Sequence, residues 1–214
     1  MENEVKKVTY TTTNSYTTLN KIGPKTKNVW LVFHGIGFLS KYFLKYFDEL
    51  NPDENYIIAP QAPSKYYLKN EYKHVGASWL TKVDTEQEME NLVAYLDSML
   101  QAEKIPENTN FIILGFSQGV SIATRYLAKT KLKCHKLIIY AGGIPNELIP
   151  SDVSYLIDDK AEVVCIVGDE DEYLTPERMR LENKKITNLF QDKAKKIIFQ
   201  GGHEMKKEII NNLV

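Results

Sequence analysis

A serine set between two glycines is the feature of this sequence that most clearly predicts chemistry. Residues 115–119 read Gly-Phe-Ser-Gln-Gly, and the strongly apolar run 111–116 leads straight into them, while a helical pattern follows. A strand, Gly-X-Ser-X-Gly and a helix in this order form a nucleophile elbow, a sharp turn that exposes the serine hydroxyl. A chance match to so short a pattern is the alternative, but the flanking elements favour the elbow. We therefore expect Ser117 to be a nucleophile beside the N-terminus of a helix.

A serine hydroxyl needs a positioned base, which a carboxylate in turn orients. The chain has four histidines. His203 follows the last predicted strand in a loop with two glycines, which favours it as the base. His34 ends an earlier apolar run. His135 lies at the start of a strand, the wrong end for the site, and is expected to be structural, whereas His74 lies in a polar stretch and is expected at the surface.

The acid is expected among four consecutive acidic residues at 169–172, which follow a buried strand between the elbow and His203. Hydrolases of this kind keep the chain order serine, acid, histidine. A solvated turn is the ordinary interpretation of such a run. Asp171 is the predicted acid, because it lies further round the loop than Asp169, which directly follows the strand. Asp169 is then expected to cap the turn, although the residue types alone leave it open as the acid.

An acyl-transfer intermediate also needs two hydrogen-bond donors for its oxyanion. The N–H after the nucleophile belongs to Gln118. A second N–H is expected from Ile36, in the Phe-His-Gly-Ile-Gly segment 33–37. His-Gly-X-Gly alone is weak evidence, since a simple glycine turn has the same composition.

These residues require elements that bring them to one place. Six short runs are apolar on both faces, as in strands inside a parallel sheet: 29–33, 55–59, 111–116, 136–141, 163–167 and 196–199. Helical patterns separate them: 39–50, 85–102 (with Asp84 as the N-cap), 118–129, 176–190 (with Pro176 in the first turn) and a short helix after His203. This alternation predicts an α/β fold with a mostly parallel central sheet and helices on both faces. Its sites lie at the carboxyl ends of the strands.

The start of the chain has a different pattern. Val5 to Leu19 is rich in Thr and Tyr, which predicts an N-terminal antiparallel hairpin turning around Asn14 and Ser15. We find no linker or internal repeat, so residues 1–214 are expected to form one domain.

Composition excludes several classes of protein. Lys and Arg number 27 against 28 for Asp and Glu, and this balance offers no basic footprint for nucleic acid. The N-terminus has no apolar signal region, and no stretch is long and apolar enough to span a membrane. We therefore expect a cytoplasmic protein. Cys134 and Cys165 lie in apolar stretches and are expected to be buried, reduced thiols.

Taken together, the chain resembles the phospholipase/carboxylesterase family of α/β-hydrolases, which includes the acyl-protein thioesterases. The matching stretches run in the family's order from about residue 28 to the end: Phe-His-Gly-Ile-Gly, Ala-Pro-Gln-Ala-Pro (59–63), Ser-Trp (78–79), Gly-Phe-Ser-Gln-Gly, Ala-Gly-Gly-Ile-Pro (141–145), Gly-Asp-Glu-Asp-Glu-Tyr-Leu-Thr-Pro (168–176) and Gly-Gly-His-Glu-Met (201–205). The resemblance implies the α/β-hydrolase fold, a Ser117–Asp171–His203 triad, an open site, a small-molecule ester or thioester as substrate, and neither a metal nor an organic cofactor.

The chain departs from the family's usual pattern in three places. Phe38 and Leu39 stand where an acidic residue usually follows His-Gly-X-Gly, Val120 replaces a glycine, and Glu172 replaces a proline. The apolar Phe38 makes the usual substrate doubtful for this chain. The Tyr- and Lys-rich segment 64–74 is either a wall of the cleft or an exposed loop.

We expect four apolar residues to line the substrate cleft, namely Phe38, Leu39, Trp79 and Leu174, although each is also a candidate for the core. If they line the cleft, short to medium acyl chains should be preferred to charged acyl groups. The predicted activity is a serine hydrolase of esters or thioesters. The alternatives are an acyltransferase that uses the same site and a catalytically silent protein that binds small molecules in the same cleft.

Overall fold

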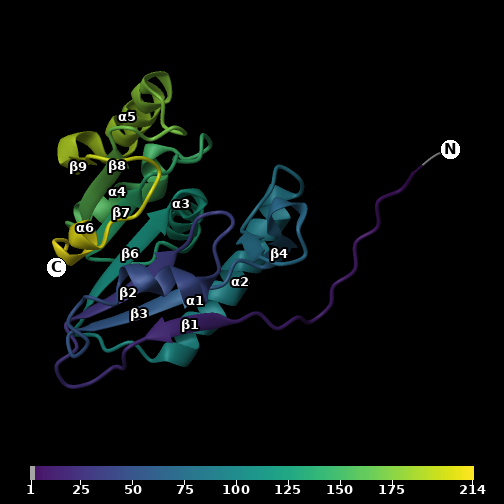
Figure 1. Ribbon diagram of the computed structural model, residues 1–214, viewed down its shortest axis with the longest axis horizontal. Coiled ribbons are helices and arrows are strands. Elements are labelled where there is room, and N and C mark those ends of the chain that lie inside the picture. Colours follow the sequence, from purple (N-terminus) through teal and green to yellow (C-terminus); the bar gives the residue numbers. More distant parts are fainter. Residues whose placement is uncertain (1–2) are drawn as a thin grey trace.

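A seven-stranded sheet forms the centre of the molecule in a computed structural model, which describes residues 3–214 (Figure 1). The strand order is β1-β3-β2-β6-β7-β8-β9, and every neighbouring pair is parallel except β1 with β3. The strands are β1 (Tyr16–Leu19), β2 (Asn28–Phe33), β3 (Asn55–Pro60), β6 (Asn110–Phe116), β7 (Lys136–Tyr140), β8 (Glu162–Gly168) and β9 (Ala194–Phe199). All six predicted strands are therefore present, and the mostly parallel α/β sheet is confirmed.

The sheet is buried on both sides, which explains why its strands are continuously apolar. Successive side chains of a strand point to opposite faces. In β2, Val29, Leu31 and Phe33 belong to one core cluster, whereas Trp30 and Val32 belong to a second cluster on the other face.

Helices cover both faces, as predicted. α2 (Thr85–Glu103), α3 (Gln118–Thr130), α4 (Pro150–Asp158) and α5 (Pro176–Phe190) contribute to the cluster that contains Val29. α1 (Ser40–Phe43), the 3-10 turn η1 (Leu44–Tyr46) and α6 (Lys207–Asn211) contribute to the cluster that contains Trp30. Two further 3-10 turns are η2 (Leu68–Asn70) and η3 (Gln191–Lys193).

The structure corrects three details of the predicted helices. The expected helix 39–50 stops at Tyr46, because residues 48–52 (Asp-Glu-Leu-Asn-Pro) favour a turn. Asp84 does not cap α2: its backbone is left-handed (φ 50°), and its side chain makes no capping hydrogen bond. The sequence patterns also missed α4, which Pro150 begins and Asp152 caps through the N–H of Ile149 (2.9 Å).

The N-terminal antiparallel strand exists, but it is not part of a hairpin around Asn14 and Ser15. β1 pairs with β3, whose residues lie some forty positions along the chain. Residues 3–15 form no regular element and extend away from the body (Figure 1). Propensity correctly indicated extended backbone here, but tertiary pairing rather than a local turn supplies the partner.

A second, two-stranded sheet projects beside the main one. β4 (Ser64–Tyr67) and β5 (Val75–Ser78) pair as an antiparallel hairpin that spans the Tyr- and Lys-rich segment. β4 is exposed along its whole length. The base of β5 is buried, and residues 76–79 pack into the body.

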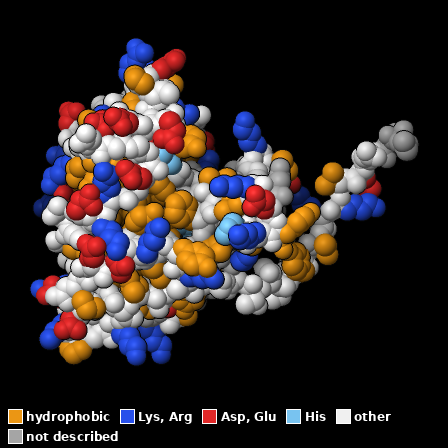
Figure 2. Space-filling model, in the orientation of Figure 1, with side chains coloured by type: hydrophobic (Ala, Val, Ile, Leu, Met, Phe, Trp, Pro, Cys, Tyr) orange, Lys and Arg blue, Asp and Glu red, His pale blue; other side chains and the backbone are white. Residues whose placement is uncertain are grey.

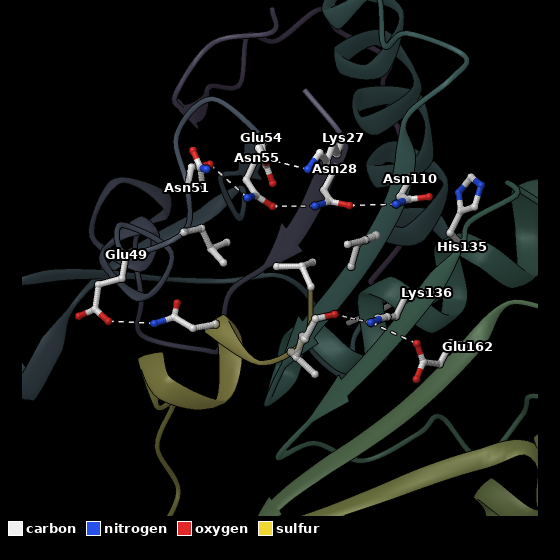
Figure 3. Close-up of a pocket in the computed structure, with 15 residues that line it drawn as sticks. Lys27, Asn28, Glu49, Asn51, Glu54, Asn55, Asn110, His135, Lys136 and Glu162 are labelled. Carbon is white, nitrogen blue, oxygen red and sulfur yellow. Dashed lines mark hydrogen bonds and ion pairs between the residues drawn. The ribbon is translucent and has the colours of Figure 1, made fainter. Parts of the chain in front are cut away.

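At the amino end of the sheet, three asparagines in one register form a ladder across β3, β2 and β6 (Figure 3). Asn110 donates to Asn28 (3.1 Å), and Asn28 donates to Asn55 (3.1 Å). Asn55 Oδ1 also accepts from the indole of Trp30 (3.0 Å), and Asn55 Nδ2 donates to the backbone carbonyl of Asn51 (3.1 Å). The three asparagines line a cavity of about 650 Å³. Their hydrogen bonds satisfy polar side chains at the point where buried strands begin.

Asn55→Ala should destabilise the fold by about 3 kcal/mol, because it leaves the buried indole N–H of Trp30 and one amide N–H of Asn28 without an acceptor. The matched control is Asn110→Ala at the exposed end of the ladder, which should cost about 1 kcal/mol. Urea unfolding of the three proteins measures both values. Equal losses would show that the ladder adds no stability beyond single hydrogen bonds.

Candidate active site

Ser117 occupies a strained turn between β6 and α3. Its backbone has φ 53° and ψ −120°, outside the usual regions for a residue with a side chain. The close packing leaves no room for side chains on either side: a Cβ at Gly119 would lie 2.1 Å from the carbonyl oxygen of Phe33, and one at Gly115 would lie 2.5 Å from the carbonyl of Gly119. This is the geometry expected of a nucleophile elbow.

The structure brings the three residues predicted to do chemistry into one hydrogen-bonded series. His203 Nε2 lies 2.9 Å from Ser117 Oγ, and His203 Nδ1 lies 2.8 Å from Asp171 Oδ2. Ser117 follows β6, Asp171 follows β8 and His203 follows β9, so the carboxyl ends of three parallel strands converge as the fold class requires.

Asp171 is held rigidly within its loop. Its side chain has no exposed surface, and Oδ1 accepts the backbone N–H groups of Tyr173 (2.9 Å) and Leu174 (3.1 Å). One carboxylate oxygen is therefore used by the loop, and the other is directed at the imidazole of His203.

Neighbouring acidic residues bind the histidine loop to the acid loop. Asp169 Oδ1 accepts the N–H of Gly201 (2.9 Å), and Glu172 Oε2 accepts the N–H of His203 (3.3 Å). The N–H of Glu170 donates to the carbonyl of Gly201 (2.9 Å). Asp169 therefore bonds to the backbone of the histidine loop, and the structure describes no hydrogen bond from its carboxylate to the imidazole. Glu172 stands where the family usually has proline, and its carboxylate bonds to the backbone of the same loop.

Two aromatic rings fix the plane of the imidazole. Phe116 lies beneath it with ring centroids 5.2 Å apart, and Tyr173 meets it edge to face at 4.7 Å. Phe116 is buried, whereas Tyr173 is 68% exposed. The imidazole therefore lies between a buried ring and an exposed one.

Two backbone N–H groups beside Ser117 are without acceptors in the described part of the chain, those of Ile36 and Gln118. The Ile36 loop lies against the serine, since a Cβ on Gly35 would lie 3.1 Å from Ser117 Cβ. The N–H of Gly37 donates to the carbonyl of Ala77 in β5 (2.8 Å), which anchors the loop from the other side.

His34 supports that loop from below. It is fully buried; its Nε2 accepts the N–H of Ala62 (3.2 Å), so Nδ1 carries the proton and donates to the carbonyl of Gly35 (2.8 Å). Burial lowers the pKa of His34 to about 4, against the usual 6.5. His34 is thus a neutral positioning residue rather than a base.

The side chain of Gln118 has a structural role that the sequence patterns missed. Its Oε1 accepts the N–H of Trp79 (2.9 Å), and its Nε2 donates to Ser78 Oγ (3.1 Å) and to the carbonyl of Leu80 (2.9 Å). The residue after the serine therefore ties the elbow to the Ser-Trp segment. The available signal was that Gln118 and the Ser-Trp segment both lie in stretches that resemble the family.

The four expected cleft residues lie in different environments. Trp79 is 1% exposed, packs against Phe33 and His34 and donates from its indole to the carbonyl of His34 (2.8 Å), so it belongs to the core. Phe38 and Leu39 are half-buried, and Phe38 contacts Phe116 edge to face at 5.8 Å. Leu174 is half-buried in the acid loop.

The sequence patterns also missed a buried carboxylate, which holds the segment that follows β7. Glu182 in α5 is 2% exposed and accepts from Arg178 (2.8 Å), Lys185 (3.0 Å) and the N–H of Ile144 (2.9 Å). The segment that it holds lies against the nucleophile: a Cβ on Gly142 would lie 2.3 Å from the carbonyl of Ser117.

The remaining histidines and cysteines lie as predicted. His74 is exposed on the projecting hairpin, and His135 accepts the N–H of Phe111 (3.0 Å) at the amino edge (Figure 3). Cys134 and Cys165 are buried free thiols, and burial raises the pKa of each to about 12. Among residues 3–214, no group of three His, Cys, Asp or Glu side chains is placed to hold a metal ion, and no helix is long and apolar enough to cross a membrane.

Comparison with solved structures shows the same fold in known hydrolases. Acyl-protein thioesterase 2 of Zea mays is 14% identical, with a TM-score of 0.69 over 94% of this chain and 96% of that one. Esterase PE8 is 19% identical, with a TM-score of 0.66 over 95% and 100%. A phospholipase/carboxylesterase of Dyadobacter fermentans is 19% identical, with a TM-score of 0.62 over 96% and 98%. These likenesses define the class as an α/β-hydrolase fold.

The family follows from the sequence itself. The model of the phospholipase/carboxylesterase family matches residues 14–214, so the chain belongs to that family, whose members are esterases and thioesterases. No match is found among curated proteins.

The buried neutral His34 predicts a loss of stability in acid. Its pKa is about 4 in the folded protein and about 6.5 in the unfolded chain, so its contribution is complete above pH 6.5 and is lost as the pH falls toward 4. At pH 5 the loss should be about 2 kcal/mol. Unfolding in urea at pH 7.5 and pH 5.0 measures it.

The control for this measurement is a histidine with an exposed side chain that makes no hydrogen bond in the described part of the chain. His74→Gln should keep the full pH dependence, whereas His34→Gln should lose about 2 kcal/mol of it while being less stable at both pH values. An unchanged pH dependence in His34→Gln would contradict the assignment.

Proposed function

We propose that the protein is a serine hydrolase that cleaves carboxylic esters or thioesters through an acyl-enzyme intermediate, with Ser117, Asp171 and His203 as its triad. The observation that carries the proposal is the series Asp171–His203–Ser117, with contacts of 2.8 and 2.9 Å, next to two backbone N–H groups that have no acceptor within residues 3–214. The family and the esterase and thioesterase neighbours support the reaction class.

In the proposed mechanism each residue has a step that its contacts support. His203 Nε2 takes the proton of Ser117 as Oγ attacks the acyl carbon, and the imidazolium then protonates the departing alcohol or thiol. Asp171 holds Nδ1–H and stabilises the imidazolium. The N–H groups of Ile36 and Gln118 stabilise the oxyanion. Water activated by His203 attacks the acyl-enzyme and releases the acid, so the cycle needs no metal or organic cofactor.

The surroundings favour an apolar acyl group on a small-molecule ester or thioester. Phe38, Leu39 and Leu174 are half-buried beside the site, and Ile36 is 53% exposed at its mouth. Ser117 itself is only half-buried, which gives water access to an acyl-enzyme and supports hydrolysis over transfer to another acceptor.

We also propose that residues 1–214 act as one domain.

Ser117→Ala should abolish ester hydrolysis without unfolding the protein; in related triads the loss in kcat reaches about 10⁶. The variant should also lose labelling by a fluorophosphonate probe. Ser121→Ala, one turn along α3 and bonded to the carbonyl of Gln118 (2.9 Å), is the matched control and should retain both. Hydrolysis of p-nitrophenyl acetate by Ser117→Ala at the parent rate would refute the mechanism.

The two aspartates of the acid loop provide a second test. Asp171→Asn should lower kcat by about 10⁴, because it favours the wrong imidazole tautomer. Asp169→Asn retains an oxygen that can accept the N–H of Gly201, so its loss should be less than about tenfold. Circular dichroism checks that both variants are folded. The reverse ranking would assign the acid to Asp169.

A further inference from the structure

A separate cavity lies between α5 and the segment that follows β7, and the proposed mechanism makes no use of it. Its volume is about 480 Å³. Sites for small molecules are commonly clefts of about 300–1,000 Å³ that combine apolar surface with a few polar groups. The cavity therefore has the size of a small-molecule site, and its lining indicates what kind of molecule it would take.

The lining of this cavity carries an excess of positive charge. Three cationic side chains, Arg178, Lys184 and Lys185, line it together with one carboxylate, that of Glu182, which leaves a net charge of +2. On the face drawn in Figure 2, by contrast, acidic and basic side chains are interspersed over the body, and the whole chain has a net charge of −1. The positive excess is thus local, and it favours an anionic ligand.

The buried carboxylate of Glu182 fixes two of these cations. It pairs with Arg178 Nε (2.8 Å) and with Lys185 Nζ (3.0 Å). The Lys185 ammonium also lies near the charge of Glu147, but Arg125 Nε pairs with Glu147 at 2.7 Å and offsets that charge. The acidic groups around the cavity are therefore each matched by a cation, and the charges of Arg178 and Lys184 remain in excess.

Those two cations also keep hydrogen-bond donors for a ligand. Arg178 makes its ion pair through Nε, and neither of its Nη atoms makes a hydrogen bond within residues 3–214. The guanidinium packs over a glycine, since a Cβ on Gly143 would lie 2.7 Å from Nη2. Lys184 is exposed and has no ion-pair partner among the described residues. The amides of Asn146 and Asn188 line the same cavity.

We propose that this cavity binds a small phosphate monoester, whose phosphate accepts from the Nη atoms of Arg178. A guanidinium presents paired N–H donors that match two oxygens of a phosphate, whereas a lysine such as Lys184 adds a point charge. The volume leaves room for the organic part of the molecule, which has an apolar contact in Leu181, a side chain that is 55% exposed on this cavity. The site does not depend on the proposed esterase activity.

Isothermal titration calorimetry of the full chain with glycerol 3-phosphate tests the proposal. Glycerol 3-phosphate and inorganic phosphate should both bind, glycerol should not, and added sodium chloride should weaken the binding. Arg178→Gln should raise the Kd for glycerol 3-phosphate by about 30-fold, as expected for the loss of charge-assisted hydrogen bonds. Arg178→Lys keeps the charge but not the paired donors and should raise it by about tenfold. Lys184→Gln should raise it by about fivefold.

Arg180→Gln is the matched control. Arg180 is exposed on the same helix and carries the same charge, but it does not line the cavity, so this variant should keep the Kd within about twofold. Urea unfolding checks that each variant is folded. Lys184→Gln removes no ion pair that the structure describes, so it should keep the stability of the parent and separates a loss of binding from a loss of fold.

Three calorimetric results would overturn the proposal: no binding of either phosphate compound, equal losses in Arg178→Gln and Arg180→Gln, or parent affinity in Arg178→Lys. Inhibition of p-nitrophenyl acetate hydrolysis by glycerol 3-phosphate that competes with the ester and is unchanged in Arg178→Gln would place the anion beside Ser117 instead. Binding should persist in Ser117→Ala. Failure of the esterase proposal would therefore leave the calorimetric result unchanged.

Discussion

The backbone of Ser117 is held at φ 53° and ψ −120°, a conformation that costs of order 1–3 kcal/mol and persists only where its surroundings enforce it. Three close backbone approaches enforce it here: Gly119 against Phe33, Gly142 against the carbonyl of Ser117, and the N–H of Ser117 donating to Tyr140 (2.9 Å). The first of these also joins α3 to the end of β2. The turn that exposes the hydroxyl is thus a consequence of how tightly the sheet and α3 pack.

The same packing explains why supporting residues away from the serine matter to the site. Buried neutral His34 holds the loop that contains Ile36, and the side chain of Gln118 holds residues 78–80, whose Trp79 in turn donates to His34. These contacts form a continuous series from the elbow through the Ser-Trp segment to the loop that contains Ile36. Under the proposed function, donors fixed in this way need no rearrangement when charge develops on a substrate.

The features that the sequence predicted correctly are those with local signals. Buried parallel strands appear as short apolar runs, and Gly-X-Ser-X-Gly, the acid loop and the histidine loop each lie directly after one of them, so topology alone places them together. The positions that sequence reasoning missed depend on partners far along the chain. Glu182 is buried because it holds Ile144, and Trp79 is core because of His34; neither pairing leaves a periodic pattern. The predicted hairpin around Asn14 is wrong for the same reason, because β1 pairs with β3, which lies far along the chain.

The two ends of the sheet differ in how their polar groups are paired. At the amino edge, the side chains of Asn28, Asn55 and Asn110 satisfy one another across three strands. At the carboxyl edge, the polar groups of the acid and histidine loops are equally well paired, but they converge so that one hydroxyl and two N–H groups stay open to a ligand. A parallel sheet aligns all of its loops at one end, so the fold can concentrate strain and unpaired donors there while the opposite end and the two buried faces supply the stability that this strain requires.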